Sequence, residues 1–88
     1  MRKKRFFRKS GLFFVYILKC RDATYYTGYT NNLKKRLRLH NSGRGAKYTM
    51  MRRPVKLAWS KKYRQFRAAF RAEALIKTLT RAQKKMIV

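Results

Sequence analysis

The sequence predicts an α+β fold in which a small sheet of three strands is flanked by helices. Two runs rich in β-branched and aromatic residues, Leu12 to Cys20 and Tyr25 to Thr30, are joined by a turn-like segment and predict a β-hairpin. A third apolar run, bounded by Pro54, predicts a strand from Val55 to Ser60. Elsewhere apolar residues recur every three or four positions, which indicates helices.

The register of the hairpin decides whether Tyr16 and Tyr26 lie on the same face of the sheet. Because side chains alternate along a strand, the two hydroxyls share a face only if paired residue numbers sum to an even value. A three-residue loop that pairs Arg21 with Tyr25 meets this condition, whereas a two-residue loop at 22–23 separates the two tyrosines. We interpret Asp22 as a turn former whose carboxylate hydrogen-bonds nearby backbone.

Helical segments are predicted on both sides of the third strand. Asn32 offers an N-cap for a helix that ends at residues 41–43. Residues 43–49 form a Gly-hinged loop with room for one helical turn. A longer helix is predicted from Arg64 to Leu79, with Phe66 and Phe70 beside its apolar stripe, and a short last helix from Arg81 to Met86.

The charge of the chain is extreme for its length. Its 88 residues carry 26 Lys+Arg and 2 Asp+Glu, a net charge of +24, and the pI is about 11.6. The hydrophobic content of 45% excludes a disordered chain, so we expect one domain at 12–88 preceded by a basic N-terminal arm at 1–11. The charge predicts a polyanionic partner, with nucleic acid, DNA above all, ahead of an anionic membrane surface.

Single cysteine and histidine residues exclude two further classes of site. Cys20 and His40 each occur once, so one chain forms neither a disulfide framework nor a Cys/His zinc site, and a reducing, cytoplasmic setting is expected. The basic start followed by an apolar run superficially resembles a secretory signal. That run stops after Leu18 without a small-residue cleavage site and is too short to span a bilayer, so no membrane association is expected.

Glu73 is conspicuous because acidic residues are so rare here. It lies on the shoulder of an apolar helical stripe. It either forms an i,i+4 pair with Lys77 or binds Mg²⁺ or another hard cation, which often takes only one or two protein carboxylates. Arg36 and His40 share one helical face, and they either border the core with polar tips in water or point into a phosphate site.

The order and spacing of these residues resemble one family. Phe14-Val15-Tyr16 and Tyr26-Thr27-Gly28 stand where two signature tripeptides would be, Asn32-Leu33-Lys34-Lys35-Arg36-Leu37 looks like a helix bearing a family arginine, and Glu73 falls at the family glutamate. Further blocks match at Tyr25-Tyr-Thr-Gly-Tyr-Thr30, His40-Asn-Ser-Gly43 and Gly45-Ala-Lys-Tyr-Thr49. The chain from about Phe13 onward thus resembles the GIY-YIG endonuclease superfamily, in particular its small stand-alone, excinuclease C N-terminal-like members.

This resemblance implies a three-stranded antiparallel sheet flanked by helices, and hydrolysis of a DNA phosphodiester by an activated water with one divalent cation, Mg²⁺ or Mn²⁺. It implies that Glu73 holds the metal, that Arg36 binds the scissile phosphate, and that Tyr16 acts as general base or orders the water, supported by Tyr26 and His40. A tyrosine with the ordinary pKa of about 10 is a poor base at neutral pH, and nearby cations are expected to lower the pKa of Tyr16. Nucleic acid is expected to contact the surrounding basic side chains, which are Lys34, Lys35, Lys47, Arg52 and Arg53.

The chain departs from the family pattern at three points, and several functions stay open. Phe14 replaces the glycine of the first tripeptide, Tyr29 stands where many relatives carry a lysine, and no asparagine follows Glu73. The first hypothesis is a metal-dependent DNA endonuclease of low sequence specificity in repair or recombination, with an unidentified protein partner as the source of target choice. The second is a catalytically weak or inactive module that binds DNA or RNA, and the third is a basic ribonucleoprotein or membrane-surface component.

Overall fold

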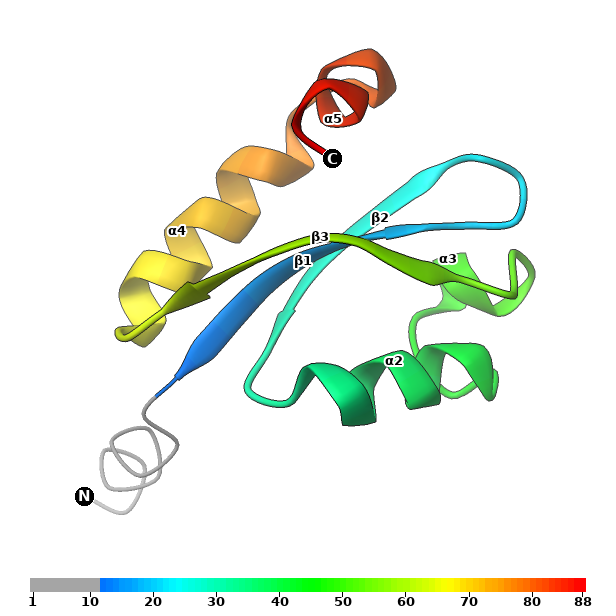
Figure 1. The fold of residues 1–88 in the computed structure, drawn as a ribbon, viewed down its shortest axis with the longest axis horizontal. Helices are drawn as coiled ribbons and strands as arrows, with labels where there is room; N and C mark the ends of the chain where they lie inside the picture. The colour runs from blue at the N-terminus through cyan, green and yellow to red at the C-terminus, as the bar shows by residue number, and fades with distance from the viewer. Residues whose placement is uncertain (1–11) are drawn as a thin grey trace.

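A three-stranded antiparallel sheet forms the centre of the structure, a computed structural model that describes residues 12–88. Its strands are β1 (Phe13–Lys19), β2 (Tyr25–Thr30) and β3 (Lys56–Tyr63), arranged in the order β2-β1-β3 (Figure 1). The predicted hairpin is confirmed, and β1 is the central strand, paired with a neighbour on both sides. The predicted basic arm lies outside the described residues.

The third strand is longer than the sequence predicts. It continues past Ser60 to Tyr63, where Lys61 and Lys62 pair with Val15 and Phe14. Charged residues interrupt the apolar run on which the prediction rests, but exposed edge strands carry lysines that protect them from pairing with another chain.

Four helices are described, which are α2 (Leu33–Asn41), α3 (Lys47–Met50), α4 (Phe66–Lys77) and α5 (Arg81–Ile87). Side-chain hydrogen bonds cap the start of two of them, α2 and α5. The Asn32 side chain accepts a hydrogen bond from the Lys35 amide at 3.1 Å, which confirms the predicted N-cap of α2. A capping box between Thr80 and Gln83 starts α5. Helix α4 is shorter than predicted at both ends, because Gln65 is extended and Thr78 forms the C-cap.

The two faces of the sheet carry separate cores because side chains alternate along β1. Phe13, Val15 and Ile17 pack with Ala69 and Ile76 of α4 on one face. Tyr16, Leu18 and Cys20 form the other core with Val55, and Leu33 and Leu37 of α2 pack against it. Figure 1 shows α4 and the α2–α3 pair on opposite sides of the sheet.

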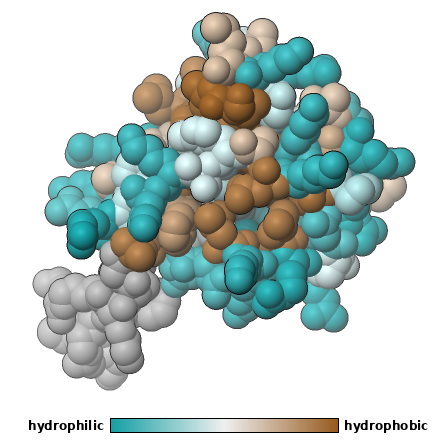
Figure 2. All heavy atoms as spheres, in the orientation of Figure 1, coloured by the Kyte–Doolittle hydropathy of each residue, from teal (hydrophilic) through white to brown (hydrophobic). Residues whose placement is uncertain are grey.

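The surface is a mixture of apolar and strongly hydrophilic groups. On the face drawn in Figure 2, hydrophobic groups lie in patches bordered by hydrophilic ones. Among the described residues, no helix is long and apolar enough to cross a membrane.

Candidate active site

Tyr16 and Tyr26 project from the same face of the sheet. Leu18 pairs with Tyr26 and Lys19 with Tyr25, so paired numbers have an even sum and the same-face condition is met. The specific pairing of Arg21 with Tyr25 was wrong, because the connection is longer: the Cys20 amide donates to the Thr24 carbonyl at 2.8 Å and closes a loop over residues 20–24. The ring centroids of the two tyrosines lie 6.5 Å apart.

Gly28 leaves the space on the sheet that the Tyr16 ring occupies. It is the residue of β2 that pairs with Tyr16. A Cβ atom on Gly28 would lie 2.5 Å from the Tyr16 hydroxyl oxygen and 2.7 Å from Cζ, closer than real contacts allow. The glycine of the second tripeptide therefore has a direct steric reason here, namely the side chain of the first tripeptide's tyrosine.

His40 connects Tyr16 to α3 by two hydrogen bonds. It is 1% exposed, with Nε2 lying 3.1 Å from the Tyr16 hydroxyl and Nδ1 lying 2.8 Å from Oγ1 of Thr49. The Thr49 hydroxyl donates its own proton to the Ala46 carbonyl at 3.0 Å. Thr49 therefore accepts from His40, which places the imidazole proton on Nδ1. The free lone pair on Nε2 then accepts the Tyr16 proton.

Burial keeps both groups of this pair neutral at neutral pH. It raises the pKa of Tyr16, an effect that Tyr26 and Glu73 reinforce and Arg36 opposes. This corrects the expectation that nearby cations lower the pKa of Tyr16, because desolvation of the 2% exposed ring outweighs the opposing charge of Arg36. Burial, followed by the charge of Arg36, lowers the pKa of His40.

Arg36 faces this hydrogen-bonded pair. It lines a small, largely apolar pocket between α2 and the sheet together with Tyr16 and Leu57. Its charge acts on the pKa of both Tyr16 and His40. Of the two interpretations considered for the Arg36 and His40 face, the structure places His40 inside the core and Arg36 at its border, beside the tyrosine.

Glu73 reaches the same region from α4. It is 8% exposed, and its Oε2 lies 2.9 Å from Nζ of Lys77, so the i,i+4 ion pair considered above is present. Its charge raises the pKa of Tyr16, and the hydrogen bond to Glu73 is the main cause that raises the pKa of Lys77. Tyr26 contributes to the shift at Lys77 as well. Of the predicted set, Tyr16, Tyr26 and His40 are in mutual contact and Arg36 lines a pocket with Tyr16, while Glu73 acts on Tyr16 through its charge from α4.

A single buried carboxylate is available to hold a divalent cation at this site. No group of three or more His, Cys, Asp or Glu side chains that could bind a metal occurs within residues 12–88, which does not fit a zinc centre. Magnesium and manganese take oxygen ligands, and magnesium needs only one or two carboxylates when water and substrate phosphate supply the rest. Glu73 could supply that carboxylate, and a metal bound there would have to share or displace the Lys77 ammonium, which lies 2.9 Å from Oε2.

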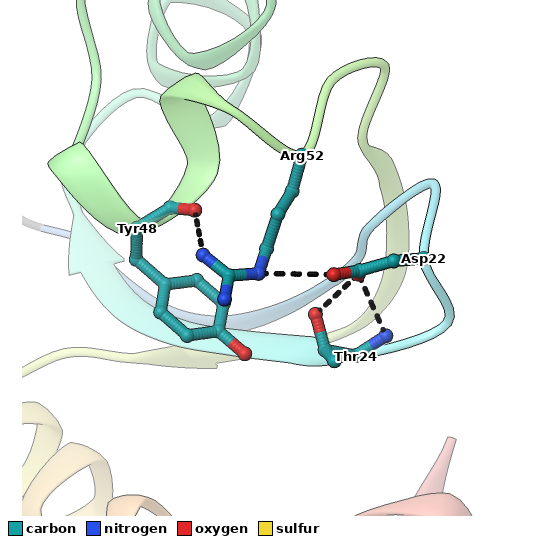
Figure 3. A network of polar contacts seen from close by, with 4 residues as sticks. All are labelled: Asp22, Thr24, Tyr48 and Arg52. Carbon is teal, nitrogen blue, oxygen red and sulfur yellow. Dashed lines mark hydrogen bonds and ion pairs between the residues drawn. The ribbon is translucent and has the colours of Figure 1, made fainter.

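The predicted nucleic-acid contacts fall into two groups. Lys34, Lys35 and Lys47 are exposed. Arg52 instead donates to Asp22 at 3.1 Å and to the Tyr48 carbonyl at 2.8 Å, with its guanidinium carbon 4.0 Å from the centroid of the Tyr48 ring (Figure 3). Arg53 donates to the Met50 carbonyl. Phosphate binding by these two arginines stays a prediction, and their present partners hold α3 and its flanking loop.

The role predicted for Asp22 as a turn former is confirmed and extended. Its Oδ1 accepts hydrogen bonds from the amide and hydroxyl of Thr24, and its Oδ2 pairs with Arg52 (Figure 3). The hairpin loop is thereby joined to the segment that follows α3.

Sequence reasoning assigned no function to Thr49 or Lys77. Thr49 lies within one of the matched blocks, but its contact with His40 depends on how α3 folds back onto α2. In the sequence, Lys77 is only the ion-pair partner of Glu73 in the interpretation that involves no metal. The i,i+4 spacing from a scarce carboxylate was the available signal for it.

Known proteins with similar sequences and structures share this arrangement of elements. Residues 12–86 match the GIY-YIG catalytic domain. The UPF0213 protein YazA of Bacillus subtilis is 47% identical over 75 residues, which cover 85% of this chain and 76% of that protein. The UPF0213 protein SAG0778 of Streptococcus agalactiae is 52% identical over 71 residues, covering 81% of each. The solution NMR structure of EF2693 from E. faecalis has 44% identity and a TM-score of 0.61, covering 86% of this chain and 81% of that one.

Proposed function

Because the chain belongs to the GIY-YIG family and has small UPF0213 proteins among its relatives, we propose that it hydrolyses phosphodiester bonds of DNA with the aid of a divalent cation. The observation that supports this most is the hydrogen-bonded series from Tyr16 through His40 to Thr49, in which the charges of Arg36 and Glu73 both act on Tyr16. General-base catalysis requires a proton acceptor in such a position.

Tyr16 acts in this proposal as a neutral phenol that relays a proton. It takes a proton from the attacking water as it passes its own proton to Nε2 of His40, so it never becomes a free phenolate. His40 becomes an imidazolium whose Nε2–H donates to Tyr16 and whose Nδ1–H still donates to Thr49. The protons on His40 and Thr49 have acceptors before and after the transfer, and Tyr16 ends as a phenol that carries the proton from the water.

Arg36 and Glu73 complete the proposed chemistry. Arg36 binds the scissile phosphate, and the incoming negative charge raises the pKa of His40, which offsets the effect of Arg36 on it. Glu73 holds Mg²⁺ or Mn²⁺, which when bound neutralises charge developing on the phosphate. Contacts from Lys and Arg to phosphates carry no sequence information, so we propose low sequence specificity, a setting in repair or recombination, and an unidentified protein partner for target choice.

The test is cleavage of labelled single-stranded, nicked and branched DNA by wild type, Glu73→Gln and Tyr16→Phe, each with Mg²⁺, Mn²⁺ or EDTA. We expect metal-dependent cutting that falls at least about 100-fold in both variants. Lys62→Gln, which removes one charge at an exposed position of β3, is the surface control and should cut like wild type.

The competing function is a domain that binds nucleic acid without cutting it, and the high net charge favours it. Absence of cleavage by wild type, with equal binding by wild type and Glu73→Gln, would establish that function instead. Cutting that survives in Glu73→Gln would remove Glu73 from the reaction.

A further inference from the structure

An aromatic side chain stands exposed on α4. Phe70 is 50% exposed, although its neighbours are other rings. Its centroid lies 5.9 Å from that of Phe66 and 6.4 Å from that of Tyr29 on β2, and Phe66 and Tyr29 are themselves 5.6 Å apart. We call these three residues the aromatic platform. Phe66 and Tyr29 hold the Phe70 ring in place while about half of its surface remains open.

The aromatic platform lies next to Glu73 on α4. Phe66, Phe70, Glu73 and Lys77 follow one another at helical spacings of three or four residues and so share a face of α4. With a rise of about 1.5 Å per residue, Phe70 and Glu73 are about 4.5 Å apart along the helix axis. The ring contacts of Tyr29 with Phe66 and Phe70 show that β2 meets α4 here.

The charges around the platform suit a polyanion. Arg67 and Arg71 are exposed on α4, and the Lys77 side chain is 54% exposed. The chain has two acidic residues, and both are paired with cations in the structure. An exposed ring among cations is the combination by which proteins bind single strands, because the ring stacks on a base while the cations contact phosphates.

We propose that the aromatic platform stacks an unpaired base of a single-stranded nucleic acid on the α4 side of the sheet, beside Glu73. The assignment of Glu73 to the active site rests on the proposed function. A base in a duplex is already stacked between its neighbours and does not offer its face, so the platform selects single strands or unpaired segments as the substrate class.

The test is binding of the full chain to three fluorescent probes in EDTA, where no metal-dependent cleavage occurs. The probes are oligo(dT), a DNA hairpin duplex with the same number of phosphates, and a strand of abasic sites that keeps the phosphates but lacks bases. For Phe70→Leu, which keeps an apolar side chain but removes the ring, we expect oligo(dT) binding to weaken about fivefold or more. Duplex and abasic-strand binding should change less than about twofold, and Phe70→Tyr should bind oligo(dT) like wild type.

Leu75→Ala is the matched control, since Leu75 is a 67% exposed apolar residue of the same helix. It should leave all three affinities unchanged, and thermal unfolding of each variant verifies the fold. Equal losses on oligo(dT) and duplex, or no loss in Phe70→Leu, would overturn the proposal. Because these readouts need no catalysis, a ring-dependent preference for oligo(dT) upholds the platform even if the chain proves unable to cut DNA.

Discussion

His40 is the only histidine of the chain, and its two ring nitrogens have different neighbours. The hydroxyl of Thr49 fixes the proton on Nδ1, and this leaves Nε2 as the acceptor that Tyr16 needs. Thr49 touches neither water nor phosphate in the proposed reaction, so it is a positioning residue. Its effect passes through the tautomer of His40.

Replacing Thr49 by valine keeps the shape of the side chain but removes the acceptor of the Nδ1 proton. We expect single-turnover cleavage to fall about 10-fold or more and the free energy of unfolding to drop by about 1–3 kcal/mol. The ¹⁵N shifts of the imidazole should show the Nδ1–H form replaced by a mixture of tautomers. Thr49→Ser should restore both readouts, and a valine variant with an unchanged tautomer would refute this role.

Acid should destabilise the protein through His40. Its ordinary pKa of 6.5 is lowered in the folded state, mainly by burial, so the unfolded chain binds the proton more tightly. Stability is therefore greatest above about pH 6.5 and falls as the pH drops through the lower folded pKa. Denaturant unfolding at pH 7, 6 and 5 should show this fall, and His40→Gln should show none. The pKa of Asp22 lies below its ordinary value of 3.8, so this carboxylate does not titrate in the same range.

At the scale of elements, the β1–β2 hairpin holds both tyrosines of the candidate active site. Its closest packing is between Gly28 and the Tyr16 ring. Gly28→Ala places a methyl group against the Tyr16 ring, so the ring must move away from His40. We expect a loss of about 1–3 kcal/mol in denaturant unfolding together with loss of cleavage.

Gly43→Ala is the control for Gly28→Ala, because Gly43 has a φ of 87° and an added Cβ would meet the Arg53 side chain, away from Tyr16. It should destabilise the protein while cleavage persists in the folded fraction. Equal cleavage by Gly28→Ala and wild type would contradict the steric role of Gly28.

Local sequence patterns predicted most helices and strands correctly, but they did not predict the contacts between these elements. The N-cap at Asn32 and the helical stripe of α4 are properties of adjacent residues, and both were found. The length of the loop at 20–24 and the approach of α3 to His40 depend on long-range packing. The pKa of Tyr16 was misjudged for the same reason, since the sequence displays its cations but not its burial.

At the scale of the whole molecule, the positive charge is nearly uncompensated. The chain has 26 Lys and Arg residues but only two acids, Asp22 and Glu73, and within residues 12–88 these pair with Arg52 and Lys77. Such a surface binds polyanions by releasing their counterions, and the released ions make affinity depend on salt.

We expect the logarithm of the DNA affinity to fall linearly with the logarithm of salt concentration, with a slope of about −0.9 per phosphate neutralised on a duplex. Removing residues 1–10, and with them Arg2, Lys3, Lys4, Arg5, Arg8 and Lys9, should lower both affinity and slope while unfolding stays cooperative. Fluorescence anisotropy titrations between about 50 and 200 mM salt measure this. A flat salt response would contradict the electrostatic account, and loss of cooperative unfolding would give the arm a structural role.

Tyr16 donates to His40, and Thr49 orients His40. Tyr16 and Thr49 lie on elements that differ in stability. Tyr16 lies on β1, which is hydrogen-bonded on both sides, whereas Thr49 lies on α3, a helix of 4 residues. Short peripheral segments open more often than central strands. Opening of α3 would remove Thr49 from Nδ1 of His40 while β1 stays paired on both sides, so we expect the site to lose this orienting hydrogen bond before the sheet unfolds.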